Sequence, residues 1–133
     1  MIVREGKSVF KGVAIGKIFV YKKADNAVKK ETVADTAAEM ARFEAAKEKA
    51  LGQLKGLYEK ALKDVGEEEA MIFDVHQMLL DDPDYNDSIK DIIENEKMNA
   101  EYAVFMTSEQ FAAMFLSMDD DYMRGRAADI KDI

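Results

Sequence analysis

Residues 66–84 read GEEEAMIFDVHQMLLDDPD and mark three successive helices. The leading glycine of this stretch favours the end of one helix, and the three glutamates that follow suit the positive dipole end of the next. Apolar residues then recur at helical spacing as far as Leu80. Asp82 followed by Pro83 has the chemistry of a helix cap and first turn. The stretch therefore predicts a helix over residues 67–80, with another helix on either side.

The residues before this stretch predict one long helix. Apolar residues recur at helical spacing over residues 40–62. Thr36 and Glu39 have the spacing of a capping box, and Thr32 is an earlier candidate for the cap. We therefore expect an amphipathic helix from about Thr36 to about Asp64.

The residues after the stretch predict three shorter helices. One opens at Pro83, one is capped by Asn99, and one begins among the acids at 119–121. The expected fold class is therefore mainly α, an antiparallel helical bundle. The last predicted helix reaches Ile133 without a helix-ending signal, so we expect the chain to be a fragment of a longer protein.

The N-terminal residues have a different chemistry. Residues 1–25 carry six basic and two acidic residues, whereas residues 26–133 carry 13 basic and 25 acidic ones. Short β-branched and aromatic runs lie between glycines in residues 7–22, which predicts two strands around a turn. We expect residues 1–25 to form a short β segment and residues 26–133 a helical domain. Strands without a partner in their own chain favour self-association.

Composition excludes several classes of partner. The chain has 133 residues and a net charge of −8, which is the wrong sign for binding nucleic acid or an anionic membrane. Its longest apolar run is six residues, far short of a membrane span. It has no cysteine, which fits a reducing compartment. We therefore expect a cytoplasmic protein whose partner is another protein.

The acidic residues around the only histidine, His76, indicate the charge of that partner. No Lys or Arg occurs between Lys63 and Lys90, whereas nine acidic residues do. An apolar stripe that includes Met78 and Leu79 lies inside this acidic frame. Such a surface is typical of docking a basic protein. A solvated acidic face and a partly buried helix histidine are the alternative interpretations.

The sequence contains no catalytic signature. Asp74 and His76 are two residues apart, so on a helix they face different sides and make a poor metal pair. The single histidine has no evident serine or cysteine partner for a triad. GVAIGK at residues 12–17 lacks the spacing of a phosphate-binding loop. We expect no catalytic residue, no metal ligand and no cofactor in this chain.

Three motifs resemble Enzyme I of the sugar phosphotransferase system, the phosphoenolpyruvate-protein phosphotransferase. GEEEAMIFDVHQMLLDDPD is similar to the family's GEEEAAIFEAHLMLLEDPEL, and GVAIGK is similar to its GIAIGK. DYMRGRAADIKDI at residues 121–133 is similar to its D-x-YL-x-ERAADIRDI, although Gly125 stands where glutamate is usual. Enzyme I takes a phosphoryl group from phosphoenolpyruvate onto its own histidine and passes it to the carrier protein HPr.

The resemblance implies the first strands of a phosphohistidine domain followed by the helical HPr-binding domain. The family's phosphorylated histidine and its domain for phosphoenolpyruvate and magnesium have no match here, so this chain alone is expected to bind HPr without phosphorylating it. Motif position assigns HPr docking to Glu67, Glu68, Asp74, His76, Met78, Leu79, Asp82 and Asp84, with Phe111, Phe115 and Met123 facing them. Arg126 is expected to steady the phosphoryl group during transfer.

Two other interpretations stay open. The first is a related protein of the same type, such as the Enzyme I-like part of a nitrogen-regulatory or dihydroxyacetone-kinase system, which would dock a similar carrier. The second interpretation is a helical scaffold or oligomerisation module without any phosphotransfer role. In the docking interpretation, the acids steer a basic carrier in a salt-dependent way, and the apolar residues form the centre of a transient interface.

Overall fold

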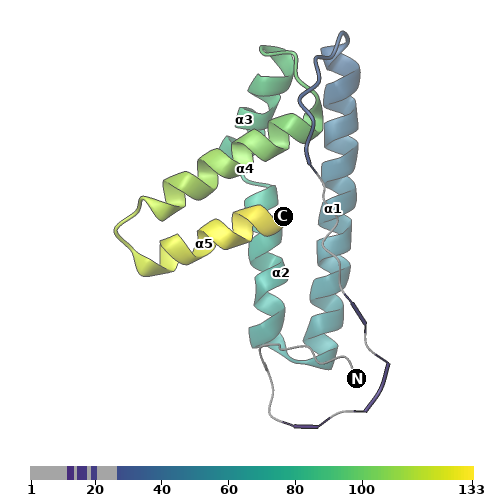
Figure 1. Ribbon diagram of the computed structural model, residues 1–133, viewed down its shortest axis with the longest axis vertical. Coiled ribbons are helices and arrows are strands. Elements are labelled where there is room, and N and C mark those ends of the chain that lie inside the picture. Colours follow the sequence, from purple (N-terminus) through teal and green to yellow (C-terminus); the bar gives the residue numbers. More distant parts are fainter. Residues whose placement is uncertain (1–11, 14, 18, 21–26) are drawn as a thin grey trace, which may run out of the picture.

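Five helices form the fold in the computed structural model, which describes residues 12, 13, 15–17, 19, 20 and 27–133 (Figure 1). Every helix predicted from the sequence is confirmed, and so is the mainly helical fold class. The described residues contain no sheet, only an isolated bridge between Thr32 and Met98. The helices are α1 Thr36–Asp64, α2 Glu67–Leu80, α3 Pro83–Glu94, α4 Ala100–Leu116 and α5 Asp121–Asp132.

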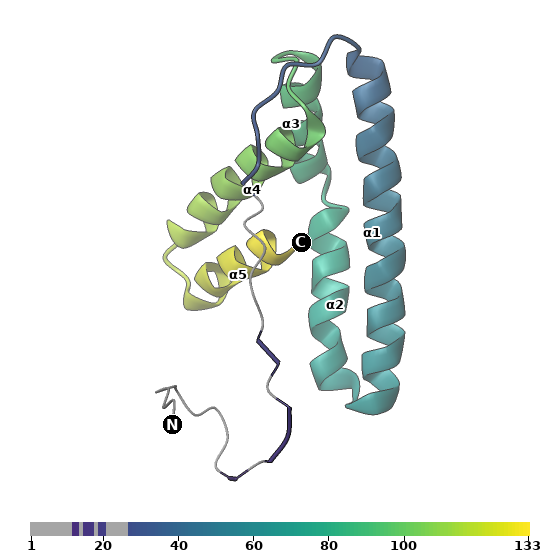
Figure 2. The same cartoon turned by 45° about the vertical axis from the view of Figure 1, so that its right-hand side comes forward.

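The long helix α1 is the support for two shorter helices that follow it. It has 29 residues, whereas α2 has 14 and α3 has 12, so at about 1.5 Å per residue α1 extends roughly 43 Å. α2 runs back along the C-terminal half of α1, and α3 lies beside the N-terminal half (Figures 1 and 2). α4 packs on α3, and α5 packs on α4. The last two helices therefore form an antiparallel pair that projects away from α1.

A tight corner joins α2 to α3. Asp82 caps α3, as predicted, and its carboxylate accepts the backbone N–H of Tyr85 at 3.0 Å. The buried side-chain amide of Asn86 donates to the carbonyl oxygens of Leu80, at 2.9 Å, and Asp82, at 2.7 Å. Because these bonds satisfy the end of α2 and the start of α3 together, they fix the direction in which α3 leaves the corner.

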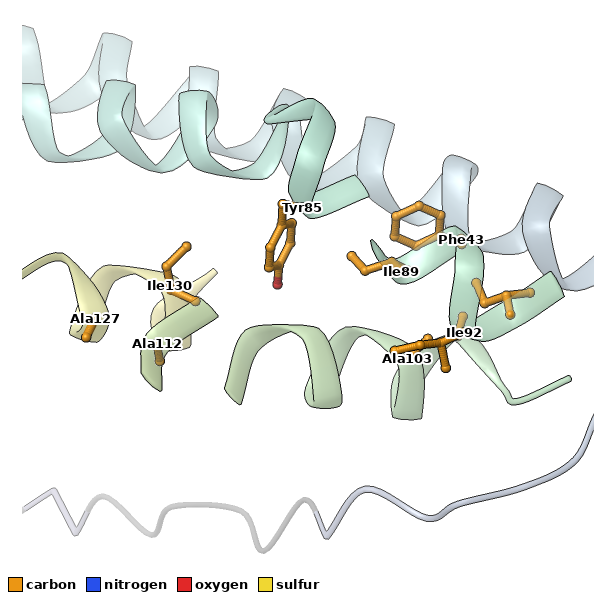
Figure 3. Close-up of a cluster of buried hydrophobic side chains, with 10 residues drawn as sticks. Phe43, Tyr85, Ile89, Ile92, Ala103, Ala112, Ala127 and Ile130 are labelled. Atoms are coloured by element: carbon orange, nitrogen blue, oxygen red, sulfur yellow. The ribbon is translucent and has the colours of Figure 1, made fainter. Parts of the chain in front are cut away.

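The core lies where α3 packs against α1 and α4, and Ala127 and Ile130 of α5 extend it. Tyr85, Ile89 and Ile93 on one face of α3 are at most 2% exposed. The ring of Phe111 on α4 meets the Tyr85 ring edge-on, with centroids 5.3 Å apart. Burying one such side chain contributes about 1.5–3 kcal/mol, so this face supplies much of the stability. The other core residues are Phe43, Ile92, Ala100, Ala103, Ala112, Ala127 and Ile130 (Figure 3).

The cap predicted for α1 is wrong. Asp35, and not Thr36 or Thr32, caps the helix, and its carboxylate accepts an N–H of the first turn at 2.9 Å. Glu39, expected to complete a capping box, instead reaches across to α4, where its carboxylate accepts the N–H of Ala100 at 2.6 Å. The first N–H groups of both α1 and α4 need hydrogen-bond acceptors. Only the tertiary structure shows that Glu39 accepts from α4 and not from α1.

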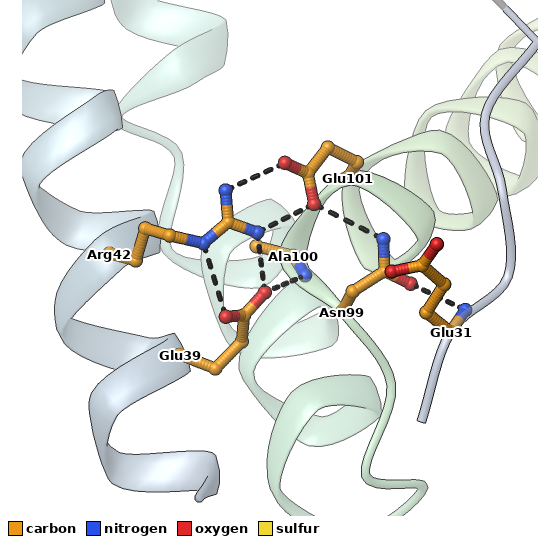
Figure 4. A network of polar contacts seen from close by, with 6 residues as sticks. All are labelled: Glu31, Glu39, Arg42, Asn99, Ala100 and Glu101. Carbon is orange, nitrogen blue, oxygen red and sulfur yellow. Dashed lines mark hydrogen bonds and ion pairs between the residues drawn. The ribbon is translucent and has the colours of Figure 1, made fainter. Parts of the chain in front are cut away.

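Asn99 stands at the cap position of α4, as predicted, but its side chain makes a different bond. Its Oδ1 accepts the backbone N–H of Glu31 at 2.9 Å, in the segment before α1. Backbone bonds from Val33 to Lys97 and from Asn99 to Glu31 join the same two segments. The side chain of Asn99 therefore attaches the segment before α1 to the connection before α4 (Figure 4).

A carboxylate–guanidinium network joins α1 to α4. Arg42 donates to Glu39 at 2.6 Å on its own helix and to Glu101 on α4, also at 2.6 Å (Figure 4). Hydrogen bonds from Arg42 lower the pKa of Glu101 to about 2 and raise the pKa of Arg42 itself. The network is largely solvated, so it aligns the two helices more than it stabilises them.

The predicted strands at residues 7–22 lie mostly outside the described residues. In the described part of that range, Val13, Ile15 and Phe19 have exposed side chains and belong to no strand. The division of the chain near residue 25 and the proposed self-association therefore stay predictions. The helices between residues 36 and 132 include none with the length and apolar character that a bilayer crossing requires.

Replacing Gly52 or Gly56 with alanine should stabilise the protein. Both glycines lie inside α1, and a Cβ at either position would meet no atom within 4 Å. Because alanine favours a helix more than glycine does, each change should raise the free energy of unfolding by about 0.5–1 kcal/mol in urea denaturation. Gly66→Ala is the matched control, since Gly66 has a φ of +113° and alanine there should be destabilising. Equal effects at all three positions would contradict the structure.

Glu101→Gln should destabilise the protein at neutral pH, and the loss should shrink in acid. Since Arg42 depresses the pKa of Glu101 in the folded state, this stabilisation is complete above the ordinary glutamate pKa of about 4.3. It disappears as the pH falls toward the folded pKa of about 2. Urea midpoints measured from about pH 7 to pH 2 test the trend. Glu96→Gln, at an exposed glutamate before α4, is the control. If the loss of stability caused by Glu101→Gln grew in acid, this explanation would be wrong.

Candidate partner-docking surface

Three of the predicted docking acids project from α2 into solvent. Glu67 and Glu68 lie in the first turn, and Asp74 lies in the middle of the helix, all with exposed side chains. Among the described residues, none of the three takes part in an ion pair. Because no described cation pairs with them, their charges act on whatever approaches this face.

The two other predicted acids lie at the start of α3. Asp84 is exposed in the first turn, whereas Asp82 is partly buried because it caps the helix. Between them and the first group, Asp81 pairs with Lys47 of α1 at 3.1 Å. Along the 14 residues of α2, these acids spread over about 20 Å. The acids thus extend over the width of a protein–protein interface rather than around one small ion.

Large apolar side chains are exposed between these acids. Met71 is 56% and Met78 63% exposed, and Ile72 is exposed as well. Leu79, also predicted to contact the partner, is partly buried and packs against the core. A shallow hollow of about 390 Å³ between α1 and α2 has Met78 at its edge. The outward face of α2 therefore combines exposed apolar groups with a rim of negative charge, which is how a docking surface is built.

The residues predicted to face α2 from the other helices are less accessible. Phe111 and Phe115 on α4 are partly buried and pack against the core cluster, and Met123 on α5 is also partly buried. The exposed apolar side chains on these two helices are instead Met114 and Tyr122, together with Phe105 and Leu116. The assignment of Phe111, Phe115 and Met123 as partner contacts stays a prediction.

His76 and Arg126 come from different helices, and one carboxylate lies between them. Asp129 Oδ2 accepts a hydrogen bond from Arg126 Nη1 at 2.8 Å, and its Oδ1 lies 3.7 Å from His76 Nε2. Arg126 also donates to the hydroxyl of Tyr122 and lies over that ring, 4.5 Å from the centroid. The bonds to Asp129 and Tyr122 raise the pKa of Arg126, so the guanidinium keeps its charge.

Asp129 is the site residue that the sequence analysis missed. Its spacing of three from Arg126 on a helix is a signal that could have predicted their pairing. The contact with His76 could not be predicted in the same way. This contact depends on how α5 crosses α2, which the sequence of neither helix determines by itself. Figure 1 shows the C-terminal end of α5 beside α2.

The arrangement provides groups that can bind a partner. Over residues 27–133 and the described part of the N-terminus, no cluster of three or more His, Cys, Asp or Glu could hold a metal ion. His76 Nε2 is buried and makes no hydrogen bond. The surface can therefore attract a cationic protein, receive its apolar side chains and present one arginine, Arg126, to an anion.

Comparison with known proteins places these features in a family. Residues 5–126 match the family described as PEP-utilising enzyme, N-terminal. The chain is 44% identical over 128 residues to a phosphoenolpyruvate-protein phosphotransferase of Bacillus sp. (strain S), and 43% identical over 129 residues to one of Listeria monocytogenes. These alignments cover 96% and 97% of this chain but 22% and 23% of those relatives. The chain thus spans about a fifth of their length.

Two solved structures share the fold. An NMR solution structure of Enzyme I (nEIt) matches with a TM-score of 0.78 and 34% sequence identity, covering 88% of this chain and 48% of that one. The N-terminal domain of Enzyme 1 - Nitrogen matches with a TM-score of 0.73 and 28% identity, covering 79% of this chain and 44% of that one. Both cover most of the helical part described above.

Proposed function

This chain belongs to the family of PEP-utilising enzyme N-terminal domains, and we propose that it docks the phosphocarrier protein HPr for phosphoryl transfer within a larger enzyme. Its relatives in Bacillus and Listeria are named for transfer from phosphoenolpyruvate to a protein, so a protein has to be held. The observation that carries the proposal is on α2, where Glu67, Glu68 and Asp74, unpaired among the described residues, flank the exposed Met71 and Met78.

The exposed acids provide the long-range part of recognition. Opposite charges on two proteins attract over roughly 10 Å at 0.1 M salt, so a basic carrier is oriented before it touches the surface. This steering raises the association rate, and it weakens as salt screens the charges. The 20 Å spread of the acids, estimated from the length of α2, suits a partner with several basic residues around its own reactive group.

The apolar residues provide the short-range part. Met78, with 63% of its surface exposed, is the most accessible apolar side chain of α2 and would be desolvated at the centre of the interface. Methionine adapts its shape to different partners, which suits a carrier that binds in more than one phosphorylation state. Because the carrier has to leave quickly, an affinity near micromolar, about −8 kcal/mol, serves the function.

In this proposal Arg126 meets the phosphoryl group carried between the proteins. A guanidinium has five N–H donors, and Asp129 and Tyr122 take up two of them, so donors are left for an anion. His76 is a poor candidate for phosphorylation, since its side chain is only 12% exposed and faces the carboxylate of Asp129. We therefore assign docking, and not the covalent step, to these 133 residues.

A carrier of the nitrogen-regulatory system is the second candidate partner. It is favoured by the similarity to the N-terminal domain of Enzyme 1 - Nitrogen. A carrier of that system would use the same acidic and apolar surface, so the fold does not separate the two. Titrating both carriers against the chain does, because the higher affinity identifies the system. The alternative of a scaffold without phosphotransfer predicts that neither carrier binds.

Reversing two charges on α2 should slow HPr association. The Glu68→Lys/Asp74→Lys variant should bind HPr at least about tenfold more weakly at low salt, mainly through a lower association rate. The difference in affinity between the variant and the parent protein should shrink as salt is raised, because screening also removes the electrostatic steering of the parent protein. Stopped-flow or surface plasmon resonance measurements give both rates. Glu96→Lys is a control for added positive charge on the connection before α4; equal loss in that variant would mean that only net charge matters.

Met78→Ala should weaken HPr binding in a different way. Truncating an apolar side chain at the centre of an interface costs about 1–2 kcal/mol, which is roughly fivefold to thirtyfold in affinity. Here the dissociation rate should rise while the association rate and the salt dependence stay the same. Leu57→Ala, an exposed apolar residue of α1, is the matched control. Unchanged dissociation from the Met78→Ala variant would remove Met78 from the interface.

A further inference from the structure

Building on the docking function proposed above, we infer that Asp129 is a positioning residue that sets the orientation of both His76 and Arg126 on the docking surface. Its two carboxylate oxygens serve two different helices. Oδ2 is 2.8 Å from Arg126 Nη1 on α5, and Oδ1 is 3.7 Å from His76 Nε2 on α2. No contact of Asp129 with the carrier is required for this role.

The burial of the three side chains makes their mutual orientation matter. The side chains of His76, Asp129 and Arg126 are 12%, 17% and 21% exposed. A carboxylate with so little access to water needs cationic or N–H groups around it. Arg126 supplies a positive charge and a hydrogen bond to Oδ2. The other oxygen, Oδ1, therefore determines which ring nitrogen of His76 can lie next to the carboxylate.

The electrostatics of this contact select one form of the histidine ring. A carboxylate can only accept hydrogen bonds, and a bare Nε2 lone pair facing it at 3.7 Å would be repelled. The proton of a neutral His76 therefore belongs on Nε2, which leaves Nδ1 as the acceptor. At 3.7 Å the two groups attract without a full hydrogen bond, in keeping with the unpartnered Nε2 of the structure.

The same contact helps to place α5 against α2. α5 packs mainly on α4 and meets α2 over only a small area. The two helices nevertheless both carry predicted docking residues, with Met78 on α2 and Arg126 on α5. Because this contact area is small, the polar contact between Asp129 and His76 should contribute to the alignment of the two helices. Losing it should turn Arg126 away from the position in which it meets the carrier.

The Asp129→Asn variant tests this role in the full 133-residue chain. The ¹⁵N shifts of the His76 ring report which nitrogen carries the proton in the neutral imidazole. The parent protein should show His76 protonated on Nε2. Asp129→Asn should change that pattern and the side-chain signals of Arg126, and should weaken HPr binding roughly threefold to tenfold. Circular dichroism verifies that the helices remain.

Asp121→Asn is the matched control. Asp121 lies on the same helix and pairs with Arg124, but it is highly exposed and does not reach α2. The Asp121→Asn variant removes the same charge as Asp129→Asn, but away from His76. It should therefore change neither the protonation pattern of His76 nor the affinity for HPr. A parent protein with His76 protonated on Nδ1 overturns the inference without any variant. So does an Asp129→Asn variant that binds HPr as well as the parent does. If the parent itself fails to bind HPr, the docking function fails, and the ring shifts still decide whether Asp129 orients His76.

Discussion

The buried face of α3 holds the other helices in their places. Tyr85, Ile89 and Ile93 are almost fully enclosed, and they contact helices on both sides of the molecule. The pair α4 and α5 makes little contact with α1 and α2 except near this helix. Removing any of these side chains would therefore loosen the attachment between the two pairs of helices as well as leaving a cavity. The corner at Asp82 and Asn86 determines where this face points.

The proposed docking surface follows from this arrangement because α2 packs mainly against α1 and leaves part of its surface exposed. Ala70 and Leu80 are buried, whereas Met71, Ile72 and Met78 of the same helix stay exposed. Helix electrostatics explain only part of the charge there. The three glutamates of the first turn suit the positive end of the dipole, but Asp74 and Asp81 lie further along, where negative charge gains nothing. Lys47 offsets Asp81, and nothing described offsets Asp74. An unfavourable charge kept on an exposed apolar face is better explained by a partner than by stability.

Local sequence signals predicted the helices well, because each boundary is chemically marked. Gly66, the Asp82–Pro83 pair and the apolar spacing of α2 each act within a few residues, and the helix bounds agree with them. The bonds expected for two cap residues were wrong because the actual partners come from elsewhere in the chain. Glu39 serves Ala100, and Asn99 serves Glu31, more than 60 residues away in each case. The candidate site shows the same limit: the acids on α2 could be read from the sequence, whereas the Asp129 contact with His76 required the crossing of α5 over α2.

The most direct test of the central claim is an amide-shift titration of unlabelled HPr into the ¹⁵N-labelled chain, at low and at moderate salt. The docking account predicts shifts concentrated at residues 67–84 and on the facing parts of α4 and α5, with an affinity that falls as salt rises. Shifts confined to another face of the molecule, or none at several hundred micromolar HPr, would contradict it. The helical bundle would then share its fold with the phosphotransferases without sharing the docking role.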